Sequence, residues 1–167
     1  MATDMRLWRR AAACLAASIG VALALTWAPG DARATPLKQE LRSVLEHAAP
    51  GAKVVGQTRV EWPRQGVTLT LRAAKTADPD CAAWWVCLHE DANYLGRMVR
   101  FNYPGTYNLA RFGMPPTRAK GASSWQNYRG PAELIGPNFR LNISGYGNYG
   151  NIPRSFNDRG TYVRVFK

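Results

Sequence analysis

Residues 81–167 contain only short apolar or aromatic runs, each bounded by Gly, Pro or Asn. No stretch in this region repeats apolar residues at helical spacing over enough residues to form a packed helix. Short strands separated by turn residues at this spacing are typical of a β-sandwich or barrel. The predicted strands are residues 85–88, 97–101, 124–128, 132–135, 139–143 and 162–166. We therefore expect one all-β domain over residues 81–167.

A short helix and a β-hairpin are predicted ahead of this domain. The sequence PLKQELRSVLEH, residues 36–47, alternates apolar and charged residues with the period of an amphipathic helix. Its apolar face consists of Leu37, Leu41, Val44 and Leu45. Two β-rich runs follow, residues 54–62 and 67–71, and the four residues PRQG between them are typical of a hairpin turn. Residues 35–72 are thus predicted to form an N-terminal helix and hairpin extension.

Residues 73–80 separate this extension from the β-domain. Their sequence, AAKTADPD, contains small, charged and proline residues without apolar periodicity. Segments of this composition are typical of linkers. We expect a linker over residues 73–80.

The first 34 residues have the pattern of a secretory signal peptide. Three arginines precede an uncharged stretch over residues 11–30, and the small-x-small triplet Ala32-Arg33-Ala34 follows it. The predicted cleavage lies between Ala34 and Thr35. The alternative is an uncleaved membrane anchor, but the apolar run is short for a span of about 20 residues. The sequence therefore predicts a secreted protein without stable membrane insertion after cleavage, and it leaves open Sec or twin-arginine export.

The chain is strongly basic, with a formal net charge of +11. Residues 1–34 contain four basic and two acidic side chains, so their removal lowers this charge to +9. Arginines interleaved with aromatic residues would suit single-stranded nucleic acid. They are spread over all the predicted strands, however, and the protein is expected to be exported. We expect no nucleic acid as partner, and an anionic cell-surface polymer is the electrostatic alternative.

Two cysteines, Cys81 and Cys87, remain after removal of the signal peptide. Because exported proteins enter a compartment that permits disulfides, we expect these two residues to be bonded. Free thiols are the alternative. A zinc site is not indicated, since the two cysteines with His47 and His89 do not have a zinc-ligand spacing.

The segment VCLHEDANYLGRMVRF, residues 86–101, resembles the first hairpin of a βγ-crystallin Greek key. That hairpin has an aromatic residue, six further residues and then Gly, with an acidic residue after the aromatic. In this sequence His89 lies at the aromatic position, Glu90 follows it, and Gly96 ends the hairpin. The ring packs on the folded hairpin, and glycine accommodates the backbone that follows.

The order of motifs around this hairpin extends the resemblance to residues 81–167. The cysteine pair precedes it, and the segments FG, ASSW and NDRGTYVRV follow it. Together they resemble actinobacterial secreted proteins of the peptidase inhibitor family typified by the streptomycete metalloproteinase inhibitor. The resemblance implies a βγ-crystallin-like double Greek-key sandwich that inhibits an extracellular metalloprotease by presenting a loop from a rigid scaffold. The candidate loops are residues 104–108, 114–120 and 144–154.

The resemblance to βγ-crystallins implies calcium as a candidate ligand. Crystallin-type sites use the signature Asn/Asp-Asn/Asp-x-x-Ser/Thr-Ser, whose oxygens suit Ca²⁺. The signature is expected once in each half of residues 81–167. In the first half Lys120 replaces the acidic residue, whereas the second half retains Asn157, Asp158 and Thr161. The resemblance therefore implies at most one weak site, shared by Asp158 and Ser123. The alternative is that Ser123, Ser124 and Thr161 only cap turns and pair strands. No other cofactor is expected.

Catalysis is not predicted, because no G-x-S-x-G, H-E-x-x-H or Cys/His constellation occurs. Glu90 and Asp91 are adjacent, so in a strand they would point to opposite faces. The second function class that we consider is a secreted, basic βγ-crystallin-type binding module for cell-wall or other anionic surfaces, without inhibitory activity.

Overall fold

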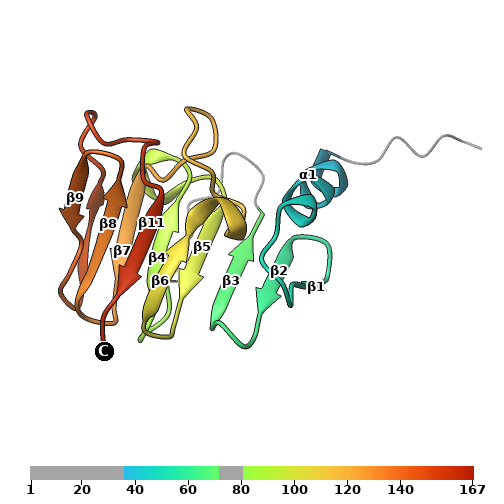
Figure 1. Ribbon diagram of the computed structural model, residues 1–167, viewed down its shortest axis with the longest axis horizontal. Helices are drawn as coiled ribbons and strands as arrows, with labels where there is room; N and C mark the ends of the chain where they lie inside the picture. Colours follow the sequence, from blue (N-terminus) through green and yellow to red (C-terminus); the bar gives the residue numbers. More distant parts are fainter. Residues whose placement is uncertain (1–35, 72–80) are drawn as a thin grey trace, which may run out of the picture. The chain divides into compact units, whose positions relative to one another are not determined.

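The computed structural model describes residues 36–71 and 81–167 (Figure 1). The predicted signal peptide over residues 1–34, with its cleavage between Ala34 and Thr35, lies outside the described residues. The predicted linker over residues 73–80 also lies outside them. Within the two described ranges, no helix has the length and apolar character needed to cross a membrane.

The predicted helix is present as α1, Pro36–Glu46. It packs on the core through Val44, which is buried, and through Leu37 and Leu41, which are half-buried. The amides of His47 and Ala48 bond to carbonyls three residues back and end the helix in a tight turn. The amphipathic pattern thus identified the helix and three residues of its packed face, whereas Leu45, predicted on that face, is exposed.

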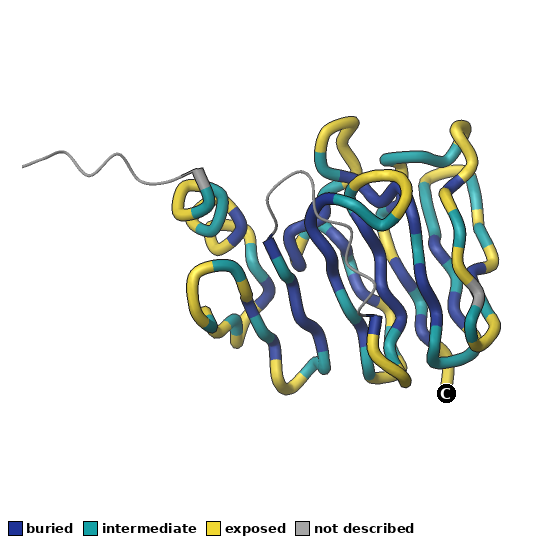
Figure 2. Tube along the Cα trace, turned by 180° about the vertical axis from the view of Figure 1, so that it is seen from behind, coloured by how far each residue is buried: buried dark blue, intermediate teal, exposed yellow. Residues whose placement is uncertain are grey.

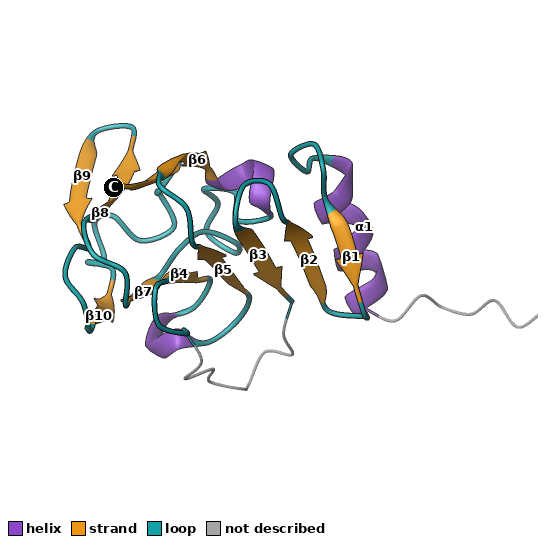
Figure 3. Ribbon diagram, turned by 90° about the horizontal axis from the view of Figure 1, so that it is seen from below, coloured by secondary structure: helices purple, strands orange, loops and turns teal. Residues whose placement is uncertain are grey.

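The rest of the described chain is two antiparallel sheets (Figures 1 and 3). The seven-stranded sheet has the order β1-β2-β3-β5-β4-β7-β10, and the four-stranded sheet has the order β6-β11-β8-β9. The strands are β1 Lys53–Val55, β2 Arg59–Trp62, β3 Val67–Thr70, β4 Val86–His89, β5 Met98–Phe101, β6 Gly105–Asn108, β7 Ser124–Asn127, β8 Ala132–Gly136, β9 Phe139–Asn142, β10 Asn148–Asn151 and β11 Tyr162–Val165. The expectation of a mainly β structure is confirmed.

Two strands occupy segments that were predicted to be loops. Strand β6 covers most of residues 104–108 and pairs with β11, and strand β10 lies within residues 144–154 and pairs with β7. The loop predictions were wrong there because the sequences GTYN and NYGN are rich in Gly and Asn, which favour turns. Pairing with a neighbouring strand decides the conformation of these segments.

Residues 81–167 form two successive units of four strands, β4–β7 and β8–β11. In each unit the third strand joins the other sheet: β6 pairs with β11, and β10 pairs with β7. The remaining three strands have the same arrangement in both units: the order is β5-β4-β7 in the first and β9-β8-β11 in the second. This exchange connects the two units by backbone hydrogen bonds as well as by the core.

The N-terminal hairpin belongs to the same sheet as residues 81–167. Strands β2 and β3 form the predicted hairpin, but the run over residues 54–62, expected as one strand, is divided into β1 and β2, which pair with each other. Strand β3 pairs with β5 so that Leu69 faces Val99. One buried cluster contains apolar residues of both sheets and of α1. Figure 2 shows buried positions alternating with exposed or half-buried ones along several strands. Helix and hairpin therefore contribute to a common core.

A disulfide joins Cys81 to Cys87, with their Cα atoms 6.0 Å apart, as the sequence predicted. Both cysteines are buried beside Met98 in a small second cluster that Trp85 and Tyr128 partly cover. The bond therefore closes a short loop immediately before β4.

Replacing both cysteines by alanine is expected to lower the free energy of unfolding by about 2 kcal/mol, because a short loop restricts the unfolded chain only modestly. Urea unfolding of the double variant and of the wild type measures this difference. Reduction of the wild-type protein should give a loss of similar size. An unchanged denaturation midpoint after reduction would contradict the prediction.

Candidate functional site

The hairpin between β4 and β5 contains the motif residues His89, Glu90 and Gly96. Gly96 has a φ of 74°, and a Cβ there would lie 2.8 Å from the carboxylate of Asp91. His89 is fully buried, and its Nε2 lies 2.9 Å from Oε1 of Gln126. Its ring meets Tyr94 edge to face, with the centroids 5.6 Å apart. His89 thus occupies the packing position of the aromatic residue in the motif.

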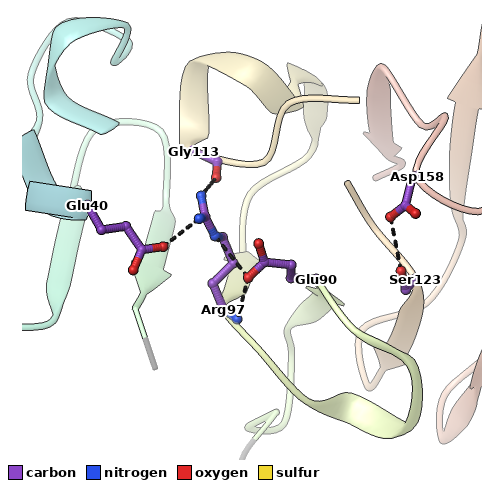
Figure 4. A network of polar contacts seen from close by, with 6 residues as sticks. All are labelled: Glu40, Glu90, Arg97, Gly113, Ser123 and Asp158. Carbon is purple, nitrogen blue, oxygen red and sulfur yellow. Dashed lines mark hydrogen bonds and ion pairs between the residues drawn. The ribbon is translucent and has the colours of Figure 1, made fainter. Parts of the chain in front are cut away.

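Glu90 forms an ion pair with Arg97 across this hairpin (Figure 4). The backbone amide and Nε of Arg97 both donate to Oε2 of Glu90, each over 3.2 Å. The other guanidinium nitrogens donate to Glu40 of α1 and to the carbonyl of Gly113. Only 4% of the Arg97 side chain is exposed. This cation therefore joins α1, the β4–β5 hairpin and the segment at Gly113.

A cavity of about 290 Å³ lies between α1 and residues 110–120. Glu40, Ser43 and His47 line it from the helix, and Arg97 and Lys120 line it from the β-domain. The Nδ1 atom of His47 lies 3.4 Å from the carbonyl oxygen of Ser43. Sequence analysis missed this arrangement, since no motif relates the helix to Arg97.

Ser123 and Asp158, the two residues of the predicted calcium site, lie within hydrogen-bonding distance of each other (Figure 4). The Ser123 hydroxyl donates to Oδ1 of Asp158 over 3.1 Å, and Asn157 Nδ2 donates to Oδ2 over 3.1 Å. The pair supplies one carboxylate and one hydroxyl, whereas Ca²⁺ takes six to eight oxygens. A weak calcium site here stays a prediction. An ion that binds only the folded state would raise the midpoint of thermal unfolding.

Close backbone packing accompanies this pair. A Cβ on Gly121 would lie 2.5 Å from the Cα of Asp158, and the Asp158 amide donates to the carbonyl of Ala122 over 3.0 Å. Asp158 itself has a φ of 59°. The geometry of this contact therefore depends on glycine at position 121.

Burial raises the pKa of the Asp158 carboxyl, the hydrogen bond from Ser123 opposes this rise, and the charge of Asp91 adds to it. The pKa of Asp158 is therefore higher in the folded state than in the unfolded state. The contribution of the protonated Asp158 carboxyl to the free energy of unfolding is complete below the unfolded-state pKa, and it is lost as pH rises through the folded-state pKa. We expect Asp158→Asn, which still offers an oxygen to Ser123, to avoid this loss.

The measurement is the free energy of unfolding of D158N relative to the wild type, from urea titrations at about pH 4 and about pH 7. The variant should gain relative stability at the higher pH. If the difference in free energy of unfolding between the variant and the wild type does not change with pH, the raised pKa of Asp158 is contradicted.

The remaining motif residues stabilise turns and strand ends. The Ser124 hydroxyl donates to the carbonyl of Asp91 over 2.7 Å and accepts from the amide of Tyr94 over 3.1 Å. The backbone of Thr161 bonds to Ile135 and Leu109. These contacts agree with the structural alternative for Ser124 and Thr161.

Of the three candidate loops, residues 114–120 remain a loop. Met114 is fully buried, whereas residues 116–119 are exposed. The amides of Lys120 and Gly121 donate to the carbonyl of Thr117 over 3.0 and 2.8 Å, so the tip is a compact turn. Arg118 lies in this exposed tip.

Within residues 36–71 and 81–167, no three His, Cys, Asp or Glu side chains are grouped as a metal site would require. No family model matches the chain, and no curated protein or solved structure matches it.

Proposed function

We propose that residues 81–167 form a βγ-crystallin-type double Greek-key domain and that the protein is a secreted inhibitor of an extracellular metalloprotease. The exchange of β6 and β10 between the sheets is the observation that carries this proposal. In each unit the fourth strand lies beside the first, as in a Greek key. The folded hairpin at His89 and Gly96 adds independent support for the resemblance from which the function follows.

The loop over residues 114–120 is the part that we assign to the protease. Its first residue, Met114, is buried and donates its amide to the carbonyl of Leu109 over 2.9 Å. Beyond its end, the amide of Ser123 donates to the carbonyl of His89 over 2.8 Å. Both flanks are thus fixed to the scaffold while the tip is exposed. Such preorganisation reduces the conformational entropy that is lost on binding.

Proteolysis assays test this assignment. The purified protein is expected to slow casein hydrolysis by a thermolysin-like protease, and Arg118→Ala should weaken inhibition about tenfold or more if Arg118 is a central contact. Arg64→Ala, which removes an exposed arginine outside all three candidate loops, is the matched control. Uninhibited hydrolysis at a large molar excess of the protein would overturn the inhibitor proposal.

A basic binding module is the second candidate. Residues 81–167 contain eleven Lys and Arg but only four Asp and Glu. Among the described residues, no carboxylate lies within ion-pair distance of Arg111, Arg118 or Arg154. Binding to an acidic polymer through such cations falls steeply with added salt. Retention on heparin that disappears with salt, without any inhibition of proteases, would favour this candidate over the first.

A further inference from the structure

A group of aromatic residues lies where β10 forms one end of the seven-stranded sheet. We define this aromatic edge as Trp84, Tyr94, Tyr128, Tyr146 and Tyr149. Trp84, Tyr146 and Tyr149 are 66%, 67% and 62% exposed, more than any other large hydrophobic residue described. Solvent exposure of three such rings in one place is unusual unless they contact a partner.

Backbone contacts place these residues next to one another. The amide of Trp84 donates to the carbonyl of Tyr128 over 2.9 Å, and the amide of Gly147 donates to the carbonyl of Asn127 over 2.8 Å. Tyr149 pairs with Gln126 in the sheet. Trp125 packs on the core, so its neighbour Gln126 points to the opposite face of the sheet. Tyr149, the cross-strand partner of Gln126, lies on that same outer face.

The backbone at this edge is strained. Four non-glycine residues described here have a positive φ, and three of them are Trp84 at 71°, Asn93 at 57° and Tyr94 at 65°. A bulky residue rarely adopts this conformation, and such strain concentrates at binding sites. The disulfide of Cys81 and Cys87 closes the loop that contains Trp84. The fold thus maintains an unfavourable backbone that presents aromatic rings to solvent.

The rings form two perpendicular pairs. Tyr146 meets Tyr128 with the centroids 5.8 Å apart, and Tyr149 meets Tyr94 with the centroids 6.3 Å apart, each at 79°. An edge-to-face contact covers only one of the four ring faces in a pair. Flat aromatic faces therefore remain for a ligand to stack on.

Two amide side chains accompany the Tyr94–Tyr149 pair, since Asn93 directly precedes Tyr94 and Asn151 follows Tyr149 by two residues. The amide of Asn93 donates to Oδ1 of Asn151 over 2.7 Å, and Nδ2 of Asn151 donates to Oδ1 of Asn93 over 3.0 Å. Both side chains are exposed, and the Nδ2 group of Asn93 can donate outward. Charged residues adjoin the edge in sequence, among them Arg129 directly after Tyr128, whose guanidinium donates to Oδ1 of Asn102 over 3.4 Å.

We propose that the aromatic edge binds an uncharged, β-linked polysaccharide. A pyranose ring presents an apolar C–H face, which stacks on an aromatic ring, and a rim of hydroxyl groups, which bond to amides. The exposed rings and the amides of Asn93 and Asn151 supply both kinds of contact without an ion pair. An extended chain can follow strand β10, where Gly147 has no side chain and nothing lies within 4 Å of the position that a Cβ would take. This site is independent of the inhibitor proposal.

Co-sedimentation of the full protein with insoluble chitin and cellulose tests the site. The wild type should bind at least one of them, with little change on addition of salt. The double variant Tyr146→Ala/Tyr149→Ala should bind about tenfold more weakly or worse. Tyr162→Ala, on β11 in the other sheet, is the matched control and should bind like the wild type. Thermal unfolding verifies that each variant is folded, and Tyr146→Ala alone replaces the double variant if that one unfolds.

Three results would overturn the proposal: no sedimentation with either polymer, equal binding by the wild type and the double variant, or binding that salt abolishes. Protease assays on the same variants separate the two proposals. Loss of inhibition in the double variant without polysaccharide binding by the wild type would assign the edge to a protein partner instead. Polysaccharide binding without inhibition would retain this site and remove the inhibitor function.

Discussion

Replacing Arg97 by methionine is expected to lower the free energy of unfolding by about 3–5 kcal/mol, because it leaves buried charge without a partner. Arg97 is the cation for both Glu40 and Glu90, and it also donates to the carbonyl of Gly113. Only 15% of the Glu90 side chain is exposed, so water compensates poorly for the lost partner. The variant should also loosen α1, since Glu40 is the helix residue in this network.

Urea unfolding measures the total loss, and hydrogen exchange at the amides of α1 measures its local part. Arg140→Met is the matched control: Arg140 pairs with Glu133, but 62% of its side chain is exposed. An exposed pair contributes about 0–1 kcal/mol. Similar losses in both variants would show that burial adds nothing to the Arg97 network.

Trp62→Ala is expected to cost a similar amount, about 3–5 kcal/mol, through the cavity that it creates. Trp62 is fully buried at the end of β2, and its ring packs edge to face on Phe112 at 5.0 Å. Its Nε1 donates to the carbonyl of Ala49 over 2.9 Å. This one side chain therefore connects the hairpin to the segment after α1 and to the β-domain.

Trp62→Phe separates the hydrogen bond from the packing, since it leaves the Ala49 carbonyl unsatisfied at a cost of about 1–3 kcal/mol. Tyr146→Ala, at an exposed aromatic residue without a positive φ, should change stability by no more than about 0.5 kcal/mol. Urea unfolding of all three variants gives the comparison. A small loss in Trp62→Ala would mean that residues 36–71 fold apart from the rest.

Local patterns predicted much of this structure correctly. The apolar spacing of residues 36–47 identified α1, and six β-rich runs after residue 81 correspond to strands. The closely spaced cysteines form the expected disulfide. The motif comparison brought together Ser123 and Asp158, which are far apart in sequence but hydrogen-bonded. Each of these features depends on periodicity or on short spacing, which a sequence displays directly.

Strands β6 and β10 were missed because their own residues favour turns, and only a partner strand stabilises them. The partners of Arg97 were missed for a related reason, since Glu40 belongs to a helix that no motif connects to the β4–β5 hairpin. The aromatic edge also depends on pairing: Tyr94, Tyr128 and Tyr149 lie on three separate segments of the chain.

The sequence by itself determined the helix, the strands with apolar or aromatic runs of their own, how basic the chain is, and which cysteines are paired. These properties follow from side chains within a few residues of one another. Tertiary structure alone decided that third strands exchange between the sheets, that Arg97 is buried between two carboxylates, and that aromatic rings gather beside β10. Those features arise from long-range strand pairing and packing, whose free energy depends on residues that local sequence patterns do not relate.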